Sequence, residues 1–239
     1  MKIEVVPPNL IDMRYLLLFL FILIFRSGVI ASDLNKQELL TIVKNYSSID
    51  CFYAQLNSFV FNNRTGQNGE KFASGFFCRN GSSFHSLFKS QECIRNSSAL
   101  LYINHKTKKV EYMIKPNGSV SKLNNEILPE FVGLVNKSDS VTSSLLGDYT
   151  VFSVYLKGYI DRVDVFVDQH QFLKKFVYYF NKKSPEKFLE FDRMVLEYSN
   201  IKTSGVDSTM FSLDQFIELH NGKIRLRPAY HDYQITEHL

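Results

Sequence analysis

The sequence contains few of the residues that mark specialised classes of protein. Only three of its 239 residues are cysteine, which excludes a small scaffold held together by several disulfides. Eleven glycines and six prolines exclude a collagen-like or low-complexity chain. The formal net charge of +4 is too small to indicate a nucleic-acid-binding protein. What remains is an ordinary globular composition, 45% hydrophobic and 22% charged, with 21 Phe, 13 Tyr and no Trp.

Long apolar runs are also absent. The longest, Tyr15–Phe25, is far shorter than the about 20 residues that a membrane-spanning helix needs. Arg14 precedes this run, Arg26 ends it, and small side chains surround Ala31. This pattern is typical of a secretory signal peptide, which we expect at residues 1–32. An uncleaved N-terminal anchor is the alternative.

The expected export leaves two possible compartments. The chain is rich in Asn, Lys, Ser and Phe, as proteins from AT-rich bacterial genomes are, and this favours the periplasm or cell envelope of a bacterium. In a eukaryotic secreted protein, the six Asn-x-Ser/Thr sequons would instead be glycosylation acceptors. The sequons begin at Asn45, Asn63, Asn80, Asn96, Asn117 and Asn136.

Beyond the leader, residues 33–239 predict a single α+β domain. Residues 33–46 predict one amphipathic helix with Asp33 as its N-cap, and residues 124–136 predict a second with Pro129 in its first turn. Short aromatic and β-branched runs separated by Asn-Gly and other polar turns predict antiparallel strands. The expected strands are 51–61, 71–78, 83–88, 92–95, 99–104, 109–114, 149–156, 162–167, 172–180 and 188–198.

Several of these strands are apolar on both faces, most clearly residues 172–180. A sheet that is covered on one side alternates apolar and polar residues, so both faces of these strands must meet apolar material. Because only two helices are available, we predict that the sheet curls around them and leaves an apolar cavity. A filled core is the alternative. The expected cavity wall is Phe152, Val154, Val165, Phe176 and Tyr178.

The cysteines give a further expectation. If residues 51–61 and 71–78 form a hairpin, Cys51 lies opposite about Asn80, and a small shift in register places it opposite Cys78. We therefore predict that Cys51 and Cys78 are neighbours and a possible disulfide. Cys93 lies beyond the next turn and is the better candidate for a free thiol.

Motifs for catalysis are absent from the sequence. It contains no GxSxG elbow, HExxH, P-loop or GxGxxG, and its cysteine and histidine spacings match no zinc pattern. Asp164 and Asp168 share a strand face but lie about 13 Å apart along it, which is too far for a common metal ion. We therefore expect neither enzyme activity, nor a cofactor, nor a metal. The basic turn at residues 106–109 is either a solvated turn or a contact for anionic lipid heads.

The order of elements resembles a known family. The opening NYSSIDCFYAQLN, the hairpin INHKTKKVEYMI, the segment DRVDVFVDQHQFLKKFVYYFN and the closing LEYSNIKTSGVDSTMFSLDQFI resemble steps of the LolA-like superfamily of periplasmic outer-membrane lipoprotein carriers. The resemblance covers about residues 33–217. Residues 218–239 depart from the best-known carriers and look closer to uncharacterised envelope relatives.

The resemblance implies a fold and a function. It implies a strongly curved antiparallel β-sheet, an incompletely closed barrel, with helices covering the concave face. In this family the space between sheet and helices is an apolar cavity that holds acyl chains of lipids or lipoproteins. The expected function is thus a carrier or sensor that performs no chemistry, with the membrane surface or envelope proteins as possible further partners. The alternative is an envelope structural or protein-interaction module with the same fold and a filled core.

Overall fold

The computed structural model describes residues 32–46, 48–114, 129–181, 191–220 and 223–238. Two α-helices lie in these ranges: an N-terminal helix at residues 32–46 and α2 at Pro129–Asn136. Both occur where the sequence predicts helices. The predicted signal peptide lies outside the described ranges except for Ser32, its last residue. Two other predicted segments also lie outside them: residues 124–128 of the second predicted helix and residues 188–190 of the last predicted strand. No helix in the described ranges is long and apolar enough to cross a membrane.

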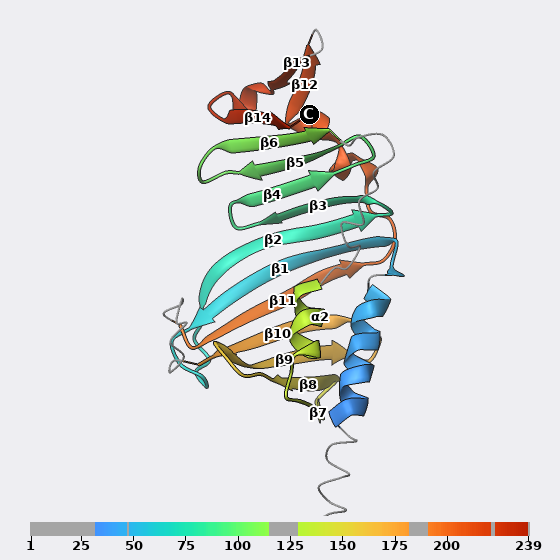
Figure 1. Cartoon of the computed structure of the whole chain (residues 1–239), viewed down its shortest axis with the longest axis vertical. Helices are drawn as coiled ribbons and strands as arrows, with labels where there is room; N and C mark the ends of the chain where they lie inside the picture. The colour runs from blue at the N-terminus through green and yellow to red at the C-terminus, as the bar shows by residue number, and fades with distance from the viewer. Residues whose placement is uncertain (1–31, 47, 115–128, 182–190, 221–222, 239) are drawn as a thin grey trace, which may run out of the picture.

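The protein is α+β and consists mainly of one large, curved, open sheet of twelve strands (Figure 1). The strand order is β14-β6-β5-β4-β3-β2-β1-β11-β10-β9-β8-β7, and every pair is antiparallel except β14 with β6. A separate hairpin, β12–β13, lies between β11 and β14 in the sequence. The strands are β1 (Cys51–Phe61), β2 (Glu70–Asn80), β3 (Ser83–Phe88), β4 (Gln91–Arg95), β5 (Ala99–Asn104), β6 (Lys109–Ile114), β7 (Ser140–Leu146), β8 (Tyr149–Tyr155), β9 (Ile160–Asp168), β10 (Leu173–Phe180), β11 (Arg193–Lys202), β12 (Ile217–His220), β13 (Lys223–Leu226) and β14 (Gln234–His238).

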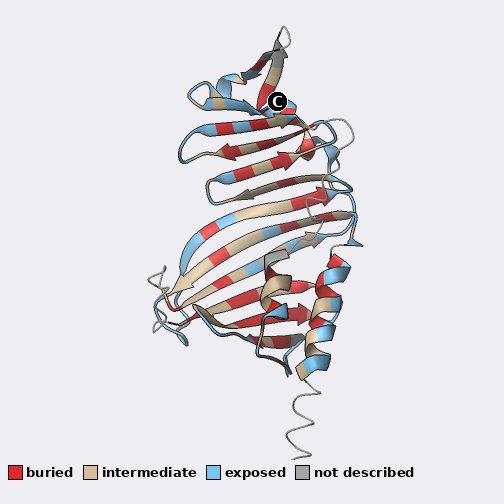
Figure 2. Ribbon diagram, viewed as in Figure 1, coloured by how far each residue is buried: buried red, intermediate tan, exposed pale blue. Residues whose placement is uncertain are grey.

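The two helices cover the concave face of the sheet over β7–β11 (Figures 1 and 2). The helix at residues 32–46 contributes Leu39 and Val43 to the main core, and α2 contributes Phe131. The Phe131 ring packs edge-on against Phe176 of β10, with ring centroids 5.0 Å apart. Tyr46 attaches the C-terminal end of this helix to β10, because its hydroxyl accepts a hydrogen bond of 2.6 Å from the Leu173 backbone N–H. Buried apolar contacts of this kind are the dominant favourable term in folding.

The C-terminal segment covers the opposite, convex face, at the other end of the sheet. Successive residues of a strand point to opposite faces, so Cys78 faces away from Phe77, which packs in the main core. The strand register continues the face of Cys78 through His85, Ile94 and Leu101. A second core lies here, in which Leu213, Phe216, Ile217 and Ile224 of the C-terminal segment pack on Ile94, Leu101, Ile103 and Val110.

The centre of the sheet joins two parts of the chain that are far apart in sequence. Strands β1–β6 follow one another as a meander, and so do β7–β11. The pairing of β1 with β11 joins the two meanders, for example Ser58 opposite Leu196. The register of this pair shifts between Tyr53 and Gln55, which is a β-bulge.

Candidate functional site

The five residues predicted to line a cavity all lie on the concave face. In register, Phe152 of β8 lies opposite Val165 of β9, which lies opposite Phe176 of β10. Val154 and Tyr178 continue the same face through Val163. Phe152, Val154, Val165 and Phe176 are at most 1% exposed and belong to the main core, and the half-buried Tyr178 packs against it.

The helices lie directly on this set of residues. Phe131 of α2 contacts Phe176, and Tyr178 stacks on Phe176 with ring centroids 6.2 Å apart. Tyr198 of β11 packs on the other side of Phe176, at 5.8 Å. An acyl chain at this position would therefore have to take the place of side chains from the helices. The predicted cavity wall stays a prediction.

An open groove of about 510 Å³ lies on the other, convex face of β1, β9, β10 and β11. Its floor includes Phe166, Val177 and Val195, which form a third buried cluster together with Val151. Phe59, Phe61 and Tyr179 pack against this cluster. The groove explains why strand β10 is apolar on both faces. Phe176 and Tyr178 face the helices. Val177 and Tyr179 face the groove. The groove is lined by Phe59, Phe61, Thr65, Gly66, Gln67, Gly69, Phe166, Lys175, Val177, Tyr179, Arg193, Val195 and Glu197.

Two cations lie over the aromatic rings of this groove. The Lys175 ammonium is 4.0 Å from the centre of the Phe166 ring, and the Arg193 guanidinium is 3.9 Å from the centre of the Phe61 ring. Both are cation–π contacts. Among the described residues, no carboxylate lies within ion-pair distance of Lys175, although Glu197 is its cross-strand neighbour on β11. The groove thus combines an apolar floor with positive charge.

Arg193 also holds the loop that borders the groove, between β1 and β2. Its guanidinium donates one hydrogen bond of 3.0 Å to the Arg64 carbonyl and a second to the Gly66 carbonyl. The Gly66 N–H in turn donates to the Asn63 side chain. Gly69 lies against the Phe61 ring, so closely that a Cβ atom would overlap it. The arginine therefore fixes the shape of the groove as well as its charge.

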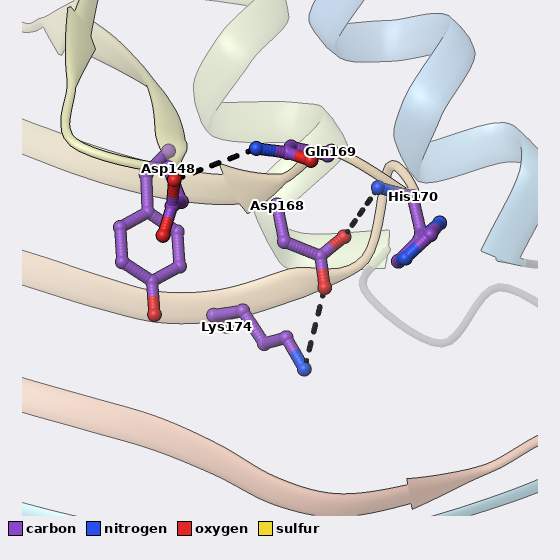
Figure 3. A pocket seen from close by; sticks show the side chains of 6 residues that line it. Asp148, Asp168, Gln169, His170 and Lys174 are labelled. Carbon is purple, nitrogen blue, oxygen red and sulfur yellow. Dashed lines mark hydrogen bonds and ion pairs between the residues drawn. The ribbon is translucent and has the colours of Figure 1, made fainter.

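A smaller pocket of about 270 Å³ lies at the turns that follow β7 and β9 (Figure 3). Asp168 accepts hydrogen bonds from the backbone N–H groups of His170 (2.9 Å) and Phe172 (2.8 Å), and forms an ion pair with Lys174 at 3.3 Å. Gln169 donates to Asp148 at 3.5 Å. Asp168 is therefore engaged in stabilising its own turn. Asp164, which shares its strand, pairs with Ser153 and Arg162.

A buried polar network links the sheet to the C-terminal segment. The Glu92 carboxylate of β4 lies 2.6 Å from His85 Nε2 and 2.8 Å from His105 Nε2. His85 Nδ1 donates to the Met210 carbonyl at 2.7 Å, and His105 Nδ1 lies 3.0 Å from the Tyr233 hydroxyl. The histidines match no motif, and their contacts with Met210 and Tyr233 join positions 125 and 128 residues apart, so sequence reasoning missed the network. Within the described ranges, no three His, Cys, Asp or Glu side chains are arranged to hold a metal ion.

The cysteines lie on neighbouring strands. Cys51 lies opposite Asn80, and Cys78 lies opposite Tyr53, so the two cysteines are diagonal neighbours on one face. All three thiols are free in this structure, and a Cys51–Cys78 bond stays a prediction. Cys78 Sγ lies 3.4 Å from the His85 carbonyl, and burial raises the pKa of this thiol to about 12. Burial also raises the pKa of Cys93, to about 11.

Comparison with known proteins finds similar solved structures but no matching family or curated sequence. Similar solved structures include an uncharacterised conserved protein from Thermus thermophilus, with 9% identity and a TM-score of 0.46, covering 84% of this chain and 98% of that one. A DUF1329 family protein from Desulfovibrio piger has 12% identity and a TM-score of 0.37, with 77% and 98% covered. The LolA superfamily protein NE2245 from Nitrosomonas europaea has 12% identity and a TM-score of 0.30, with 73% and 97% covered.

The family that the sequence resembles is therefore represented among the similar structures.

Proposed function

We propose that this protein is an exported binding protein of the periplasm or cell envelope. It holds an acyl chain of a lipid or lipoprotein, as a carrier or sensor, and performs no chemistry. The observation that supports this function best is the convex groove, because it combines apolar side chains with the cations Lys175 and Arg193. Its volume of about 510 Å³ lies within the range of about 300–1,000 Å³ that is usual for small-molecule sites.

The apolar floor and the two cations of the groove favour a ligand with an apolar chain and a negatively charged head group. An acyl chain that lies along Val177, Val195 and Phe166 gains about 25 cal/mol for each Å² of apolar surface removed from water. Lys175 is within reach of an anionic head, since no carboxylate in the described ranges forms an ion pair with it. Carboxylate and phosphate heads share this chemistry.

The first experiment is mass spectrometry of organic extracts of the purified mature protein. A co-purified fatty acid or phospholipid is expected. The Val177→Trp variant fills the groove from its floor and should lose this lipid. If the chain bound beneath the helices instead, at Phe152, Val154, Val165, Phe176 and Tyr178, V177W would keep the lipid and a Val165→Trp variant would lose it.

A second experiment tests the charge, with dodecanoate and dodecanol as probes of equal chain length. Calorimetric titration should show that Lys175→Met weakens dodecanoate binding about fivefold, corresponding to about 1 kcal/mol for a partly exposed ion pair, and leaves dodecanol binding unchanged. Lys174→Met is the matched control, because this neighbouring lysine pairs with Asp168 outside the groove. If neither probe binds and no lipid co-purifies, the alternative of an envelope interaction module with a filled core is correct.

A further inference from the structure

β7 is one of the two edge strands of the large sheet, and among the described residues the N-terminal helix bonds to its backbone at only one end. The Val141 N–H donates to Ser32 Oγ at 3.0 Å, and the Val141 carbonyl accepts from Asn35 Nδ2 at 3.3 Å. These contacts show that the backbone groups of Val141 point away from β8. In an antiparallel pair this orientation recurs at every second residue, so the backbone groups of Ser143 and Leu145 also point outward.

The backbone groups of Ser143 and Leu145 have no partner within the described part of the chain. The helix reaches Ser143 only through a side-chain contact, in which the Ser143 hydroxyl lies 2.9 Å from Asn35 Oδ1. At the tip of the strand, Leu145 is 83% exposed and Leu146 is 61% exposed. Unpaired donors and acceptors beside exposed leucines form a template for another strand.

Beyond the helix contact at Val141, β7 lacks the charges, prolines and bulges that usually protect an edge strand. Its sequence, SVTSSLL, contains no charge and no proline, and its register with β8 is unbroken from Ser140 to Leu146. The opposite edge differs, because β14 has Glu237 and His238 among its five residues. Natural sheets block edge pairing with such charges, with proline or with bulges.

We propose that β7 pairs antiparallel with β7 of a second copy of this chain, so that two copies share one continuous sheet. The free outward positions, Ser143 and Leu145, are symmetric about Ser144. A two-fold axis at Ser144 therefore sets Ser143 of each copy opposite Leu145 of the other, and each pair exchanges backbone hydrogen bonds. Such an isologous contact closes on itself and stops at a dimer.

The side chains favour this pairing. The two copies of Leu145 become diagonal neighbours, about 7–8 Å apart between their Cα atoms, which is within reach of leucine side chains. Leu146 lies opposite Thr142 on the other face, and no like charges meet within the strand. A single pair of short strands buries less than the about 1,200–2,000 Å² of a stable interface, so the dimer is expected to be weak and concentration-dependent.

Sedimentation equilibrium of the mature protein tests the proposal. A monomer–dimer equilibrium is expected, with a dissociation constant on the order of 10–100 μM. Ser143→Pro removes an outward N–H but no hydrogen bond to β8, and should weaken dimerisation at least tenfold. Ser143→Ala is the control, because it removes the hydroxyl and keeps the N–H. Circular dichroism should show that both variants are folded.

Leu145→Lys provides a second test that leaves the backbone unchanged. It places two ammonium groups across the two-fold axis, so dimerisation should weaken at low salt and recover partly at high salt. A protein that stays monomeric to about 1 mM would overturn the proposal, and so would a dimer that S143P and L145K both leave unchanged. A wild-type protein that elutes with a different protein bound at β7 would also overturn it.

Discussion

Replacing Glu92 by leucine should loosen the C-terminal segment from the sheet. Glu92 is 7% exposed, and its carboxylate is the shared partner of His85 and His105. His85 faces an acceptor at each ring nitrogen, the Met210 carbonyl and the carboxylate. Both contacts are hydrogen bonds at the same time only if the ring is protonated on both nitrogens or Glu92 is itself protonated. Leucine accepts nothing, so at least one buried donor loses its partner.

The magnitude follows from the burial of each histidine. The His85 side chain is only 7% exposed, so losing its acceptor costs the full penalty for an unsatisfied buried group, about 2–3 kcal/mol. The His105 side chain is 28% exposed and is able to turn to water, which reduces its share to about 0.5–1 kcal/mol. Glu92→Leu should therefore lower the free energy of unfolding by about 3 kcal/mol. Glu92→Gln should cost about 1 kcal/mol, because glutamine can accept from one histidine and donate to the other when the latter is neutral.

Urea denaturation measures this loss. With a slope of about 2 kcal/mol per molar urea, E92L should unfold at about 1.5 M less urea than the wild type, and E92Q at about 0.5 M less. Limited proteolysis should cut E92L first within residues 208–238, which the network attaches to the sheet. Glu111→Leu is the control, because Glu111 lies exposed on β6. If E92L and E111L unfold within about 0.5 M of each other, the network does not stabilise the fold.

Three further predictions concern the core and the thiols. Phe131→Ala should lower the free energy of unfolding by about 3–5 kcal/mol in urea, because it removes the aromatic contact of α2 with the sheet; a loss below about 1 kcal/mol would mean that α2 contributes little. Iodoacetamide at pH 8 should label Cys51 before Cys78 or Cys93, because burial raises the pKa of the latter two and keeps them protonated. A peptide map in which Cys78 is labelled first would contradict this prediction. The free energy of unfolding should fall between pH 9 and pH 12, because the Cys78 thiol ionises with a pKa of about 9 in the unfolded chain and about 12 in the folded one. Cys78→Ala should reduce this fall. An equal fall in the variant would mean that other groups cause it.

The α+β class and most of the elements could be predicted from local sequence patterns, whereas the strongly curved, open sheet was implied by the resemblance to the LolA-like superfamily. The 33–46 helix and most strands have clear apolar periods, and the five predicted wall residues do share one face. The orientation of that face could not be predicted, because strand 172–180 is apolar on both sides and its register shifts between Leu173 and Lys175. β7 was not predicted, since five of its seven residues are exposed and it lacks an alternating apolar pattern.

Long-range features were beyond sequence reasoning for a different reason. The parallel pairing of β14 with β6 joins segments about 125 residues apart, and no local pattern specifies such a partner. The groove on the convex face requires β1 and β11 to be neighbours, which becomes clear only once the strand order is known. The polar network around Glu92 is also long-range, because His85 bonds to Met210, which lies 125 residues further along the chain.

The junction between β1 and β11 also shapes how this chain folds. Each of the meanders β1–β6 and β7–β11 is built from contacts between sequence neighbours, which form quickly because little chain entropy is lost in closing short loops. The β1–β11 ladder closes a loop of more than 130 residues, between Phe61 and Arg193, and so carries a much larger entropic cost. Folding should therefore be limited by the meeting of two preformed sheets along this seam. Until they meet, β1 and β11 are both bare edges, and the seam is where the newly made chain is most exposed to pairing with the wrong partner.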